Sequence, residues 1–214
     1  MTGKSHVTIG VITYATLWIQ PLGGINVPLL ADTHSVIALP IALPIALALV
    51  LLGSLLPDLD HPDGRLANER ILGVPLLKPF AWLINKVFGH RGATHSLLAL
   101  AGIVVIGELL FLPWIWAHLV GGFATIGITL SGDVPLVPWR GAHLGLLLGW
   151  GYAFHLLADG FTKAGVPLLW PLDNRFGIPP FRSLRFTTGT WREGLTVACL
   201  TIACLVNAAR ALIG

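Results

Sequence analysis

The stretch Leu56-Pro57-Asp58-Leu59-Asp60-His61-Pro62 closes a long apolar run and brings two carboxylates and an imidazole into one turn. Side chains of these types can together hold a divalent ion. The flanking prolines stiffen the turn and reduce the entropy that is lost when ligands are organised. Aspartates at a helix C-terminus oppose the helix dipole, so a purely structural turn would not favour them. The stretch therefore predicts one wall of a metal site.

A second polar stretch, Gly89-His90-Arg91-Gly92-Ala93-Thr94-His95-Ser96, precedes the next apolar run. Its glycines allow a tight backbone, so both imidazoles could point inward. Arg91 could bind a phosphate or pair with an aspartate, and Ser96 or Thr94 can cap the following helix. The alternative interpretation is a capped helix start with surface histidines.

A third polar stretch, His155-Leu156-Leu157-Ala158-Asp159, ends another apolar run. Residues four apart lie on one face of a helix, so His155 and Asp159 could bind one ion together, or the aspartate could orient the histidine. His6 begins the first apolar segment and is a further candidate ligand. Three other histidines, His34, His118 and His143, are interpreted as interfacial or core residues.

The composition indicates a membrane protein. The chain has 214 residues, of which 55% are hydrophobic and 11% charged, and its mean hydropathy is +0.80. Soluble domains usually contain about 25% charged residues. We therefore expect an all-α, polytopic helical membrane protein in which residues 1–214 form a single membrane-embedded domain. No basic stripe interleaved with aromatic residues is present, so no nucleic-acid partner is expected.

Five apolar segments are expected to be membrane helices. They are residues 1–20, 35–56, 96–117, 142–158 and 194–213. Residues 65–88 mix charged and apolar side chains, which indicates either an amphipathic helix at the interface or a solvated loop with a short helix. Residues 118–140 are expected to be re-entrant or interfacial.

The charge distribution predicts which side of the membrane carries the three polar stretches. If these stretches share one side, then eleven of the thirteen lysines and arginines lie on that side. Only Arg140 and Arg210 lie on the other side. Cytoplasmic segments carry an excess of these residues, so the site is expected to face the cytoplasm.

Together, these three stretches and His6 resemble the YdjM family of inner-membrane, metal-dependent hydrolases. The resemblance extends through 162–171 and covers most of the chain up to about residue 185. It implies a helical protein of the bacterial inner membrane with a metal-dependent hydrolase activity. The helical arrangement of histidine and aspartate is also distantly similar to zinc-dependent phospholipase C, which suggests a phosphoester substrate.

These observations predict hydrolysis of a phosphoester or lipid-like substrate at the cytoplasmic interface. The expected cofactor is Zn²⁺, with Mn²⁺ and Fe²⁺ as alternatives. The expected partners are the lipid bilayer and a small-molecule or lipid substrate. The candidate metal ligands are His6, Asp58, Asp60, His61, His90, His95, His155 and Asp159. The candidate catalytic residues are Asp58, Asp60 and Arg91.

Two other functions fit parts of the sequence. A metal ion could only join the helices, in a structural or regulatory role. A metal transporter would need ligands along a path through the bilayer, and Glu108 is the only acid deep in an apolar run.

Overall fold

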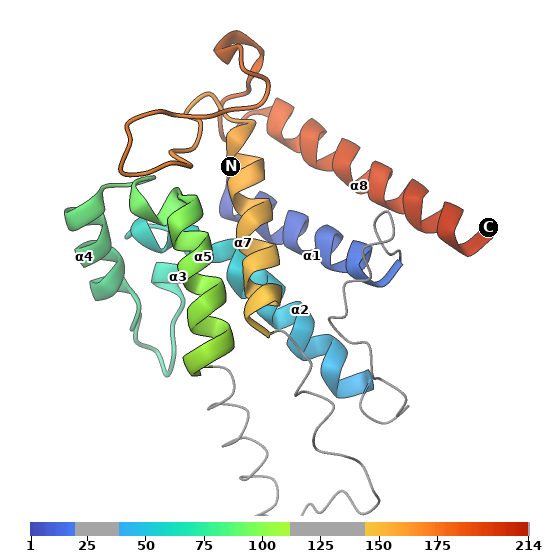
Figure 1. The fold of residues 1–214 in the computed structure, drawn as a ribbon, viewed down its shortest axis with the longest axis horizontal. Coiled ribbons are helices and arrows are strands. Elements are labelled where there is room, and N and C mark those ends of the chain that lie inside the picture. The colour runs from blue at the N-terminus through green and yellow to red at the C-terminus, as the bar shows by residue number, and fades with distance from the viewer. Residues whose placement is uncertain (20–38, 112–143, 214) are drawn as a thin grey trace, which may run out of the picture.

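The computed structural model describes residues 1–19, 39–111 and 144–213, which are mostly helical (Figure 1). The α-helices of these residues are α1 (Gly3–Ile19), α2 (Leu39–Leu55), α3 (Arg65–Asn68), α4 (Lys78–Phe88), α5 (Leu97–Ile106), α7 (Leu144–Gly160) and α8 (Trp191–Ile213). The short 3₁₀ helices are η2 (Pro57–Asp60), η3 (Ala93–His95) and η6 (Arg182–Leu184). A π-helical segment, η4 (Gly107–Phe111), continues α5.

The prediction of a polytopic protein with about five membrane helices is wrong for the described residues, because none of their helices combines the length and apolar character that a crossing needs. A crossing takes about 20 apolar residues. Helices α1, α2 and α7 have 17 residues each, and α5 has 10 before it changes to π-helix. Helix α8 has 23 residues but contains Arg192, Glu193 and Arg210. Residues 20–38 and 112–143, which include His34, His118, His143 and the segment expected to be re-entrant, lie outside the described residues.

Helix α7 is the centre of the fold and packs against α1, α2 and α5 (Figure 1). Glycines allow the closest of these contacts. A Cβ atom added at Gly151 would lie 2.0 Å from the carbonyl oxygen of Val50, and one added at Gly53 would lie 2.1 Å from that of Leu148. Helices α2 and α7 therefore touch backbone to backbone. This contact brings the turn after α2 beside the C-terminal end of α7.

We expect Gly151→Ala to destabilise the protein, because the new methyl group must push two helix backbones apart. Overpacking of this kind costs about 1–3 kcal/mol. The matched control is Gly102→Ala in α5, where an added Cβ would meet nothing within 4 Å. That change should be neutral or stabilising, because alanine favours helix by about 1 kcal/mol. Thermal unfolding of the purified proteins measures both effects, and equal midpoints for the two variants would contradict the close contact.

Helix α5 begins as predicted, because Ser96 caps it. The Ser96 hydroxyl accepts a hydrogen bond from the Ala99 amide at 3.1 Å. Residues 65–88 form α3, a tight turn at Ile71–Val74 and the amphipathic helix α4. Helix α4 leaves Phe80, Trp82 and Val87 exposed. The chain therefore passes from the turn after α2 to the start of α5 through two short helices.

The segment 161–186 covers the C-terminal end of α7 (Figure 1). Two isolated bridges, Thr162 with Phe186 and Val166 with Phe176, hold it in place. The buried Arg185 side chain donates hydrogen bonds to the carbonyls of Pro179 and Pro180 at 2.7 and 2.8 Å. These contacts fix a long loop that has little regular structure of its own.

Glu193 attaches the start of α1 to the start of α8. Its carboxylate accepts hydrogen bonds from the Thr2 amide at 2.6 Å and the Gly189 amide at 2.7 Å. Burial raises the pKa of Glu193, but hydrogen bonds from Ser5, Thr2 and Gly189 outweigh burial and leave this pKa below its usual range. The ionised carboxylate holds the first turn of α1, which carries His6.

Candidate metal centre

Four separate elements supply the side chains of a buried histidine–aspartate cluster. Asp58 comes from η2, His95 from η3, and His155 and Asp159 from α7. His6 comes from α1, and its ring stacks on that of His155 with 3.6 Å between centroids. All of these side chains are fully buried except that of Asp58, which is 18% exposed. The structure thus brings together residues that are up to 153 positions apart (6 to 159).

The facing nitrogen and oxygen atoms of this cluster have the spacing of a coordination shell. The Nε2 atoms of His95 and His155 are 3.3 Å apart. Asp58 Oδ1 lies 3.9 and 3.7 Å from these two nitrogens, and Asp159 Oδ2 lies 3.6 and 3.9 Å from them. Ligands about 2.1 Å from a tetrahedral ion are about 3.4 Å from one another. The two imidazole nitrogens, together with either carboxylate oxygen, therefore approach the spacing of ligands around a zinc-sized ion.

Hydrogen bonds orient both imidazoles toward the centre. The Nδ1–H of His155 donates to the carbonyl of Ser54 at 2.7 Å. Nδ1 of His95 lies 3.2 Å from Asp60 Oδ2, which can only accept. Each Nε2 then carries a lone pair, and these two lone pairs face each other. Because two acceptors at 3.3 Å repel unless a cation or proton lies between them, this arrangement fits a metal ion.

The protonation of the cluster also suits a cation. Burial and the nearby His6 lower the pKa of His155 well below its ordinary value, so its imidazole is neutral. Burial raises the pKa of Asp159, but contacts with His6, His155 and the amino group of Met1 outweigh burial and leave this pKa well below its ordinary value. Neutral imidazole and ionised carboxylate are the forms that bind metals.

His6 supports a second ligand set. Its Nε2 lies 3.4 Å from Asp159 Oδ1, without the alignment of a hydrogen bond, and neither ring nitrogen has a hydrogen-bond partner. Two groups of three residues keep their ligand atoms within 4.8 Å of one another: His6 with His155 and Asp159, and Asp58 with His95 and His155. A buried imidazole without partners is costly, which a bound ion would relieve. His155 belongs to both groups.

Asp60 was predicted as a ligand, but the structure places it behind the cluster. Its Oδ1 accepts from His90 Nδ1 at 2.7 Å, and its Oδ2 accepts from the Arg91 amide at 2.8 Å. The hydroxyl of Thr94 also donates to Oδ2. Burial raises the pKa of Asp60, but hydrogen bonds from His90, His95 and Thr94 hold it well below its usual range. Asp60 therefore orients two histidines and belongs to neither group of three.

His61 and His90, also predicted as ligands, lie outside both groups and line a neighbouring cavity. Their rings meet edge to face with centroids 4.8 Å apart. Nδ1 of His61 accepts from the Asp63 amide at 3.2 Å. The His90 side chain is 41% exposed. Both imidazoles are therefore accessible from the cavity rather than enclosed in the cluster.

Arg91, predicted to be catalytic, holds Asp159. Its Nη2 forms an ion pair with Asp159 Oδ2 at 2.8 Å that is not aligned as a hydrogen bond. Its Nη1 donates to the Thr162 hydroxyl at 3.1 Å. The φ of Arg91 is +58°, a left-handed conformation that costs energy for a side chain other than glycine. The other oxygen of Asp159 contacts the amino group of Met1.

Four residues of the site were not predicted: Ser54, Thr94, Tyr152 and Thr162. Each orients another group through a hydrogen bond. The Tyr152 hydroxyl donates to the carbonyl of Thr94, and burial together with the charge of Asp60 raises the pKa of Tyr152, so it stays protonated. The spacing of Tyr152, His155 and Asp159 at i, i+3 and i+7 could have indicated Tyr152. Nothing in the sequence indicates the backbone contact of Ser54.

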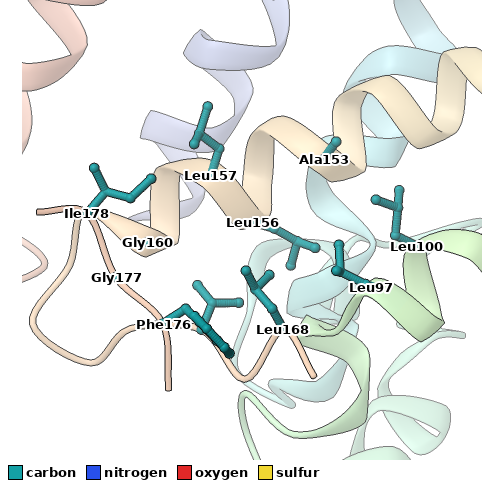
Figure 2. A pocket seen from close by; sticks show the side chains of 11 residues that line it. Leu97, Leu100, Ala153, Leu156, Leu157, Gly160, Leu168, Phe176, Gly177 and Ile178 are labelled. Atoms are coloured by element: carbon teal, nitrogen blue, oxygen red, sulfur yellow. The ribbon is translucent and has the colours of Figure 1, made fainter. Parts of the chain in front are cut away.

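The cavity beside the cluster has a volume of about 620 Å³. Asp58, His61, His90 and Arg91 line one part of it, so the partly exposed Asp58 connects the cavity with the buried cluster. A second pocket, of about 200 Å³, lies between α5, α7 and the 161–186 segment and is lined by residues such as Leu97, Leu156 and Leu168 (Figure 2). Its lining offers no carboxylate or imidazole, so this second pocket does not serve the cluster.

The fold and the site define a helical protein with a buried histidine–aspartate cluster that is reached from a polar cavity. The chain belongs to the YdjM inner membrane protein family, whose family model matches residues 1–212. The predicted resemblance is therefore confirmed. Family membership also supports the predicted location at the inner membrane, and the cytoplasmic orientation of the site stays a prediction.

Relatives in three bacteria resemble the chain. It is 37% identical over 134 residues to inner membrane protein YdjM of Escherichia coli (strain K12) and, equally, to the protein of the same name from Shigella flexneri. The match covers 60% of this chain and 50% of each relative, so the chain spans about half the length of these curated relatives. Protein YvsG of Bacillus subtilis (strain 168) is 27% identical over 205 residues, which cover 95% of this chain and 91% of YvsG. The chain matches no solved structure.

Proposed function

We propose that the protein is a metal-dependent hydrolase that cleaves a phosphoester or lipid-like substrate at the inner membrane. The observation that carries this proposal is the pair of facing imidazole nitrogens of His95 and His155, each within 3.9 Å of a carboxylate oxygen of both Asp58 and Asp159, beside an open polar cavity. His155 would hold the ion together with Asp58 and His95, or together with His6 and Asp159. Zn²⁺ suits this mixture of nitrogen and oxygen ligands, with Mn²⁺ and Fe²⁺ as alternatives.

A divalent ion held there would polarise the bond to be cleaved and lower the pKa of an attacking water. The protein's own residues supply the rest of the chemistry. His90 donates its Nδ1–H to Asp60, which leaves Nε2 free to accept a proton in the cavity. A histidine oriented in this way by a carboxylate is a suitable general base. Arg91 keeps Asp159 in place, and Asp60 does the same for His95.

The orientation proposed for the site is cytoplasmic. Arg65, Arg91 and Arg175 line the cavity, and most lysines and arginines of the chain follow or precede the polar stretches that form the site. Positive charge is favoured on the cytoplasmic side.

A structural ion is the second candidate, because most of the cluster is fully buried. Structural sites are closed, whereas catalytic sites keep an open position. The exposure of Asp58 to the cavity favours the catalytic proposal. No comparable observation among the described residues favours a transporter.

Metal removal tests the proposal. The purified full chain should contain on the order of one zinc ion, and it should hydrolyse soluble phosphodiesters or phospholipids. Chelation should lower the rate by about a hundredfold or more, since a metal contributes several kcal/mol to such reactions, and added zinc should restore it. Bound zinc without turnover of any phosphoester would support the structural ion instead. A protein without transition metal would contradict both.

A further inference from the structure

We infer that Arg65 and Arg175 bind an anionic phosphate group of the substrate in the cavity beside the cluster. This inference rests on the proposed function and adds to it the residues that select the substrate. Both arginines line the cavity of about 620 Å³ that Asp58, His61 and His90 also line. They come from distant segments, since Arg65 begins α3 and Arg175 lies in the loop that covers α7.

The two guanidinium groups have no partner within the described residues. No carboxylate of that part of the chain lies within 4.0 Å of either one, and neither donates a hydrogen bond there. The other arginines around the site differ: Arg91 is engaged by Asp159 and Thr162, and Arg185 by two carbonyls. Arg65 and Arg175 are also the exposed ones. They are therefore available to a ligand that enters the cavity.

The charge of the cavity favours an anion. Arg91 is paired with Asp159, so Arg65 and Arg175 balance the two aspartates of the lining, Asp58 and Asp63, as long as no ion is bound. A divalent ion at the cluster would add two further positive charges. Like charges that converge on a cavity repel one another, and an anion between them relieves the repulsion. A neutral ester or a peptide bond would gain nothing from this field, whereas a phosphate would.

Arginine is also suited geometrically to this role. Its planar guanidinium donates two parallel hydrogen bonds to phosphate oxygens, which a lysine cannot do. Arg65 follows the Asp58–His61 turn by four residues and lines the same cavity as the proposed ligand Asp58. The phosphate of a lipid headgroup and that of a soluble phosphoester share this chemistry.

The test measures binding of inorganic phosphate to the zinc-loaded full chain by calorimetry, after the zinc content of each variant has been determined. Arg65→Gln and Arg175→Gln should each weaken phosphate binding about tenfold, because the loss of one charge-assisted hydrogen bond lowers the affinity by about this factor. The zinc content of both variants should be unchanged. Arg65→Lys should restore only part of the loss. The control is Arg182→Gln, an exposed arginine outside the cavity lining, which should bind as the wild type does.

Competition identifies the source of the phosphate. Displacement of bound phosphate by phosphatidylcholine vesicles that contain phosphatidic acid indicates a lipid headgroup, and displacement only by glycerol phosphate indicates a soluble phosphoester. Either result supports the inference if Arg65→Gln and Arg175→Gln weaken the binding of phosphate. Wild-type affinity in both variants, or loss of their zinc, would overturn it. A wild-type chain that binds phosphate but no metal would instead refute the proposed hydrolase while leaving the anion site intact.

Discussion

His155→Gln should remove the metal ion from the purified protein. His155 is the residue that the two ligand groups share, and its Nε2 lies 3.3 Å from that of His95. We expect zinc affinity to fall by more than about a hundredfold, because removal of a residue that only orients a ligand already lowers metal affinity 10–100-fold. Hydrolysis should be lost with the metal. Zinc content by mass spectrometry and a titration with a competing chelator measure the change.

The matched control for this variant is His61→Gln. His61 lines the cavity beside the cluster but lies outside both ligand groups, so zinc content should be kept. Circular dichroism and thermal unfolding show whether each variant is folded. A folded His155→Gln protein with wild-type zinc affinity would exclude the cluster as the metal centre. Loss of zinc from His61→Gln but not from His155→Gln would assign the metal centre to the cavity instead of the buried cluster.

Asp60→Asn should weaken both metal binding and catalysis without removing a ligand. Asp60 is fully buried and accepts hydrogen bonds from His90, the Arg91 amide and Thr94, and it lies beside Nδ1 of His95. An asparagine offers one acceptor oxygen, and its NH₂ group would face another donor. We expect zinc affinity to fall about 10–100-fold, and hydrolysis to fall further because His90 loses its orientation as well.

Asp63→Asn is the control for zinc affinity, because Asp63 is exposed, lies in the same turn and belongs to neither ligand group. The Asp63 backbone amide donates a hydrogen bond to His61 Nδ1, and the substitution leaves this amide in place.

Asp60→Asn should also lower the free energy of unfolding by about 1–3 kcal/mol, since a buried donor remains without a partner. Unchanged zinc affinity in Asp60→Asn, with turnover reduced, would restrict Asp60 to the orientation of His90.

The sequence alone indicated several of the polar residues that the structure brings together. The turn at Asp58, the histidine-rich stretch around His95 and the pair His155 and Asp159 all contribute to one cluster. They could be predicted because charged and imidazole groups are rare in an apolar chain, and their helical spacing is regular. The sequence also predicted the Ser96 cap, since such a cap depends on local contacts.

Only the tertiary structure separated the candidate ligands from the residues that orient them. Asp58 and Asp60 are two positions apart and identical in type, yet one faces the cluster and the other faces His90 and the Arg91 amide. The backbone of η2 and its packing decide this, and neither is visible in composition or spacing. The prediction of membrane-spanning helices is wrong for the described residues for a related reason: hydropathy measures apolar content, while α5 gives way to π-helix after 10 residues and close glycine contacts bury helices against each other. The sequence determined which chemical groups are present, and the packing of α2 against α7 determined which of them meet.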